Sequence, residues 1–197
     1  MIGLLKGLLV EQVTPDGISA DLQRLEPDLS PHQAAALADV LVPFIRSMSE
    51  ALAWAIGLSK SRSCGRAVAF STGSVLLYLF DEEDLLPEAT FGALGLIDDA
   101  FAVHVLVRQL RDAFPFAAPP ADYESPARST IELVAAILPD GAAMALQRTC
   151  RSLVEVASAL FAVPAETEAP DDGAVPSLRL RAAVVPPQSK SPVKERT

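Results

Sequence analysis

Residues 67–80 are AVAFSTGSVLLYLF, the longest run of this chain without a charged side chain. Its second half, residues 75–80, is compatible with a buried strand or with a helix. A strand needs a second strand to pair its backbone groups, and no segment of comparable strength lies nearby. The run is therefore expected to be a helix. Fourteen residues in a helix extend roughly 21 Å, short of the roughly 30 Å hydrocarbon core of a bilayer.

The composition of the chain agrees with a helical fold. Half of its 197 residues are apolar but only 6% are aromatic, so the core must consist mainly of alanine, leucine and valine. Such small side chains favour closely packed helices over a strand-rich sandwich. We expect an all-α domain of five to seven helices over residues 1–163, with a central helical hairpin. Residues 164–197 contain six prolines and little that can build a core, which predicts a flexible, disordered tail.

Several helix boundaries carry sequence signals. Ser30-Pro31 and Ser125-Pro126 each place a capping hydroxyl before a proline, which is typical of a helix start. Residues 2–13 have apolar side chains at helical spacing and predict a short amphipathic helix. Residues 14–17 predict a turn, followed by a polar connector to Leu29. Pro43 interrupts the next helical pattern and is expected to kink or divide that helix.

Residues 81–99, DEEDLLPEATFGALGLIDD, allow two interpretations. Converging carboxylates bind hard cations, so one alternative is a divalent-metal site. Its candidate ligands are Asp84, Glu88, Asp98 and Asp99, with His104 assisting. The other interpretation is structural: the aspartates precede apolar runs where they satisfy helix N–H groups. In that interpretation Asp84 and Pro87 shape a turn, Gly95 lets two backbone segments approach, and Asp98 caps the following helix.

The net charge, the cysteine spacing and the absence of known motifs disfavour other function classes. A net charge of −9 and a pI near 4.7 offer no basic surface for a phosphate backbone, so no nucleic-acid partner is expected. Neither a GxSxG elbow nor a phosphate-binding glycine loop is present in the sequence. Cys64 and Cys150 lack metal or redox spacing and are expected to be small buried hydrophobes.

The sequence over about residues 67–111 resembles the YkvA-like family. The matching positions are Tyr78, the motif Asp84-Leu85-Leu86-Pro87-Glu88, Gly95 and Asp98-Asp99-Ala100. The chain departs from that family at Glu82, where the family usually has proline, and at Glu88, where it usually has aspartate. Its link from the motif to the glycine is one residue longer. The resemblance implies a small helical domain of unknown function, common in bacteria and often membrane-associated, that is also found attached to other modules, including a RING-type ubiquitin ligase. It implies no catalytic residue.

The sequence therefore predicts a non-enzymatic interaction or adaptor protein in the cytoplasm. The mean hydropathy of +0.31 is high for a soluble monomer. We expect the surplus apolar surface to bind a protein partner or a second copy of the chain, with peripheral membrane contact through residues 2–13. No cofactor is expected in this interpretation. The alternative is a metal-dependent hydrolase-like enzyme that uses the acidic residues of 84–99.

Overall fold

The computed structural model describes residues 2–80, 85–116 and 126–162, all within the compact unit Met1–Val163. These residues form helices and no strand, which confirms the all-α fold. The elements in chain order are α1 (Ile2–Gln12), α2 (Pro15–Leu25), α3 (Pro31–Arg46), α4 (Met48–Leu58), α5 (Gly65–Leu79), α6 (Glu88–Phe91), the 3₁₀ helix η1 (Gly92–Leu96), α7 (Ile97–Ala113), α8 (Arg128–Ile137) and α9 (Ala142–Leu160).

Two groups of neighbouring elements are nearly continuous. α3 and α4 follow each other across Ser47, and α6, η1 and α7 run from Glu88 to Ala113 without a break. Counted as continuous runs, the described residues contain seven helical segments, at the upper end of the expected range of five to seven. The residues expected to form the tail, 164–197, lie outside the described part of the chain.

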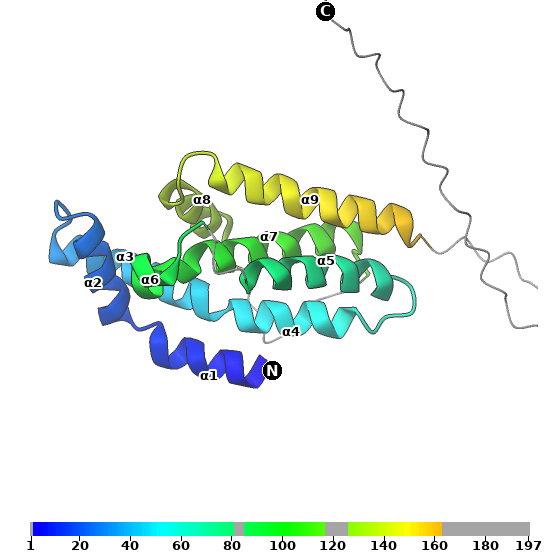
Figure 1. Cartoon of the computed structure of the whole chain (residues 1–197), viewed down its shortest axis with the longest axis horizontal. Coiled ribbons are helices and arrows are strands. Elements are labelled where there is room, and N and C mark those ends of the chain that lie inside the picture. Colours follow the sequence, from blue (N-terminus) through cyan, green and yellow to red (C-terminus); the bar gives the residue numbers. More distant parts are fainter. Residues whose placement is uncertain (1, 81–84, 117–125, 163–197) are drawn as a thin grey trace, which may run out of the picture. The chain divides into compact units, whose positions relative to one another are not determined.

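α7 is the central helix of the domain. It packs against α9, α4 and α5 and also contacts α3 and α8, and Figure 1 shows it running through the middle of the bundle. Its residues are buried on every side over more than two turns, from Ile97 to Val107. A stretch of helix that is buried all round needs mainly apolar side chains, and between Ile97 and Val107 the polar ones are Asp98, Asp99 and His104. The central hairpin predicted from the sequence is confirmed as α5 packed against α7.

α3 begins as its sequence indicates. Ser30 is the N-cap residue, and its hydroxyl accepts the backbone N–H of Gln33 at 3.3 Å. The Gln33 side chain accepts the Ser30 backbone N–H at 3.0 Å, which completes a capping box. Pro31 occupies the first helical position, where its missing N–H leaves no partner unsatisfied.

The expected turn and connector at residues 14–29 were wrong. Thr14 is the N-cap of α2, and its hydroxyl accepts the backbone N–H of Gly17 at 3.1 Å. Ile18 and Leu22 then bury one face of this helix. Thr14-Pro15 is the same cap-plus-proline signal as Ser30-Pro31, so the prediction gave too much weight to the aspartate and glycine that follow.

The helix expected to start at Ser125-Pro126 also begins later. Ser125 lies outside the described residues, and the N-cap position of α8 is Ala127, without a side-chain cap. The Ala127 carbonyl accepts the first helical N–H groups, from Thr130 and Ile131. Pro126 lies two residues before Arg128, the first residue of the helix.

The helix that contains Pro43 is divided one turn after the proline. α3 continues through Pro43 and ends at Arg46, and the Ser47 N–H bonds back to the Pro43 carbonyl at 3.0 Å. The ring of a proline crowds the preceding turn and removes one N–H donor. The turn before Pro43 nevertheless stays helical, and the break comes at Ser47, after which α4 begins with Met48.

Two runs in the described part of the chain are long and apolar enough to cross a membrane by length and composition alone. They are Pro31–Leu58 and Glu88–Ala113, and 56% and 72% of their most apolar windows are buried inside the domain. The core helices of soluble proteins meet the same criteria, so these runs are weak indications of a membrane span.

Candidate functional site

The end of α5 and the start of α7 are joined by a partly buried tyrosine–carboxylate hydrogen bond. The Tyr78 hydroxyl donates to Asp98 Oδ2 at 2.6 Å, and Asp98 is fully buried. Burial raises the pKa of the Asp98 carboxyl, and the hydrogen bond from Tyr78 acts in the opposite direction. Burial and the neighbouring Asp98 also raise the pKa of Tyr78. The hydroxyl therefore stays protonated and can only donate to the carboxyl group when Asp98 is ionised.

Asp98 is not the helix cap predicted from the sequence. α7 starts at Ile97, its N-cap position is Leu96, and no side chain caps it. Asp98 and Asp99 lie in the first turn instead, where a negative charge still interacts favourably with the helix dipole. The helix starts earlier because η1 leads into α7 without a break, so no free N-cap site exists before Asp98.

The turn between α5 and α7 depends on a close backbone approach at Gly95. A Cβ atom at Gly95 would lie 2.6 Å from the Leu86 carbonyl oxygen and 2.9 Å from the Glu88 Cα. Pro87 is the N-cap residue of α6, and its carbonyl accepts the N–H of Thr90 and Phe91. The structure thus places Pro87 and Gly95 at the turn, as expected. Asp84 lies outside the described residues.

Sequence reasoning missed a contact between this turn and α2. Gly92 has a φ of +66°, and a Cβ atom there would lie 2.5 Å from the Asp21 carboxylate. Asp21 also accepts the Leu94 N–H at 3.4 Å and pairs with Arg24 at 3.2 Å. The Arg24 guanidinium donates to the Thr90 carbonyl at 3.0 Å. The signal that could have revealed this contact was the cap at Thr14, which makes residues 15–25 a helix.

His104 occupies the break between α3 and α4. Its Nε2 lies 3.0 Å from the Phe44 carbonyl oxygen and 3.2 Å from the Ser47 hydroxyl. A carbonyl only accepts, so Nε2 carries the proton and donates. The Ser47 hydroxyl donates to the same carbonyl at 2.9 Å. Burial lowers the pKa of His104 to about 4, so the ring is neutral near neutral pH.

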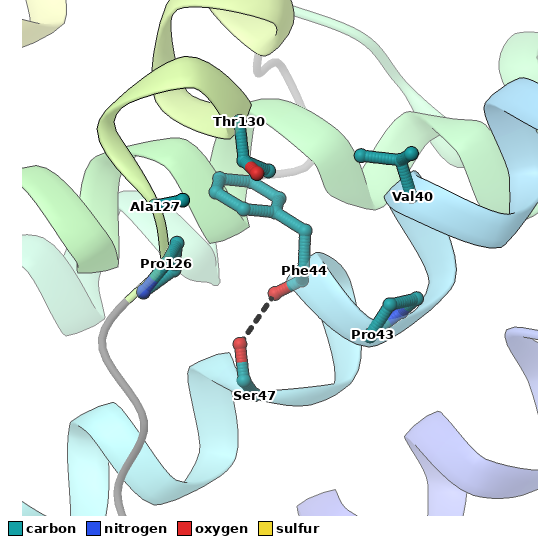
Figure 2. Close-up of a pocket in the computed structure, with 7 residues that line it drawn as sticks. All are labelled: Val40, Pro43, Phe44, Ser47, Pro126, Ala127 and Thr130. Carbon is teal, nitrogen blue, oxygen red and sulfur yellow. Dashed lines mark hydrogen bonds between the residues drawn. The ribbon is translucent and has the colours of Figure 1, made fainter.

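A shallow pocket of about 300 Å³ lies on the outer side of this break (Figure 2). The Phe44 ring forms one wall, and the ring also contacts His104 with centroids 4.7 Å apart. Figure 2 shows this ring beside Thr130 and Ala127, with Val40 and Pro43 on the α3 side. The pocket lining is mostly apolar, and its hydroxyl groups come from Ser47 and Thr130. It also borders Pro126, the first described residue after the gap at 117–125.

The described candidate metal ligands do not form a cluster. Within residues 2–80, 85–116 and 126–162, no three His, Cys, Asp or Glu side chains are placed to hold one metal ion. Asp98 contacts Tyr78 of α5, whereas His104 contacts Phe44 of α3. Glu88 is exposed on α6 and interacts with Asp98 through its charge. Because Asp84 is outside the described residues, the metal alternative stays a prediction.

The solvent-facing side of α5 carries several exposed apolar side chains. This helix packs against α4, α7 and α9, and its remaining side is open. Large apolar side chains lie on that open side: Phe70 is 41% exposed, Leu77 76% and Phe80 72%. Phe70 also contacts Phe161 at the end of α9, with ring centroids 6.1 Å apart. We define the α5 face as Arg66, Phe70, Gly73, Leu77 and Phe80.

Comparison with known proteins finds no match for this chain. No family model matches it, no curated protein matches it, and no solved structure matches it. The resemblance to the YkvA-like family therefore stays a prediction, and function has to be argued from the geometry of the chain itself.

Removing the Tyr78 hydroxyl should destabilise the domain without unfolding it. We expect Tyr78→Phe to lower the free energy of unfolding by about 1–3 kcal/mol, because it leaves a buried carboxyl group without its hydrogen-bond donor. Denaturant unfolding of Tyr78→Phe, Asp98→Asn and the double variant measures the coupling between the two side chains. A coupling energy near zero would contradict a structural role for this hydrogen bond.

The same variants test the metal alternative. A ligand that binds only the folded protein raises its melting temperature by mass action. The metal alternative predicts a rise with Mg²⁺, Mn²⁺, Ca²⁺ or Zn²⁺ that Asp98→Asn abolishes. A purely structural carboxylate predicts no metal-dependent change in either protein.

Proposed function

We propose that this protein is a non-enzymatic interaction protein that binds another protein molecule through the α5 face. The observation that supports the proposal is the exposure of Leu77 and Phe80 on a helix whose other sides are already buried. Contiguous exposed apolar side chains on a soluble domain mark interaction surfaces more often than scattered single ones do.

The chemistry of the interior supports the same proposal. Several buried polar side chains of the described domain have known contacts, and these contacts hold parts of the fold together. Tyr78 and Asp98 join two helices, and His104 satisfies a backbone carbonyl at a helix break. Cys150 is buried, and burial raises the pKa of its thiol to about 11, which makes it a poor nucleophile. These groups stabilise the structure and leave the surface as the place for function.

The proposal includes the cytoplasm as the working compartment and a peripheral membrane contact as an additional role. Cys64 and Cys150 are both free and buried, which agrees with a reducing compartment. The membrane contact would involve α1, where Gly3, Lys6 and Val10 are among the exposed residues and Lys6 pairs with Glu50 at 2.7 Å. Binding to lipid vesicles, measured by co-sedimentation, tests this additional role.

A charged residue in place of Leu77 on the α5 face should abolish the interaction. We expect the Leu77→Glu protein to have the native mass of a single 20.8 kDa chain. The native mass is measured in gentle extracts of the cells that make the protein. The wild-type chain should migrate as a larger species. Leu77 is 76% exposed, so the substitution should leave the melting temperature nearly unchanged.

Val10→Glu is the matched control for this substitution. Val10 is 50% exposed and lies on α1, which packs against α4 and α3. This variant adds the same charge to the same class of exposed apolar position and should keep the larger native mass. The proposal is wrong if the wild-type chain is a compact monomer in the extract and binds neither protein nor lipid.

A further inference from the structure

We draw no further inference here: the strongest candidate, the solvent-facing side of α5 on which Leu77 and Phe80 are exposed, belongs to the site already described, and nothing in the described part of the chain shows what covers it.

Discussion

Replacing Gly95 by alanine should lower the free energy of unfolding by about 2–3 kcal/mol, and Gly95→Val should prevent folding. The reason is the absence of space at the turn between α5 and α7. A Cβ atom at this position would lie 2.6 Å from the Leu86 carbonyl oxygen and 2.9 Å from the Glu88 Cα. Both are backbone atoms, so neither can rotate away as a flexible side chain would. The start of α7 would have to separate from the segment that precedes α6.

Gly57→Ala provides the matched control for this substitution. Gly57 lies inside α4, and a Cβ atom there meets nothing within 4 Å. Alanine has a better helix propensity than glycine, so Gly57→Ala should raise the free energy of unfolding by up to about 1 kcal/mol. Urea unfolding of both variants measures the difference. If Gly95→Ala were as stable as the wild type, the close approach of the two backbone segments would be incorrect.

Acidification should destabilise the domain through His104. The folded protein lowers the pKa of this imidazole to about 4, against an ordinary value of about 6.5 in the unfolded chain. Between these values the unfolded chain binds more protons, so stability is present above pH 6.5 and is lost as the pH falls toward 4. Between pH 7 and pH 5 this single group should cost about 2 kcal/mol.

The physical cause is the position of the ring. Its Nε2 already donates to the Phe44 carbonyl, and the ring lies 2% exposed among core residues. A positive charge there would lose its hydration. The hydrogen bond to the Phe44 carbonyl and the charge of Glu50 act in the opposite direction and favour the protonated ring, but burial is the larger effect on the pKa. Protonation therefore loosens the contact between α7 and the α3–α4 break.

His104→Gln separates this effect from other titrating groups. The glutamine side chain can place an amide N–H near the position of Nε2 but does not ionise in this pH range. The variant should be less stable than the wild type at pH 7 and should show a flatter loss of stability toward pH 5. Asp98, whose pKa is raised, contributes with the opposite sign in both proteins, so it cancels in the comparison. Parallel pH curves would contradict the assignment to His104.

The helical nature of the chain could be predicted because it depends on local patterns. The uncharged run at 67–80 had no strand to pair with, and it forms α5. The return helix α7 followed from an apolar pattern that continues past His104. The turn between them required a glycine, and Gly95 is the residue that the two backbone segments approach. Each of these features depends on neighbours in the sequence or on a requirement that few residue types meet.

The errors came where two signals competed within a few residues. Thr14 and Pro15 start α2, but Asp16 and Gly17 are also typical of a turn. Burial of Ile18 and Leu22 decides in favour of the helix, and that burial depends on α3, which packs against α2. Asp98 is not the N-cap of α7 because η1 leads directly into α7, which starts before Asp98. Tertiary contacts determine such boundaries, and local propensity contributes less.

By itself, the sequence determined an all-helical domain, the hairpin of α5 and α7, and the glycine at its turn, because hydrophobic period and backbone freedom are local properties. Only the tertiary structure decided what the polar residues do. His104 and Asp98 are six residues apart on one helix, yet one satisfies the carbonyl of Phe44 and the other accepts a hydrogen bond from Tyr78. It also decided which side of α5 is exposed. In α5 the polar residues Ser71 and Thr72 are buried and Leu77 is exposed, so its sequence does not indicate its open side, and only the packing of α4, α7 and α9 shows that Leu77 remains uncovered.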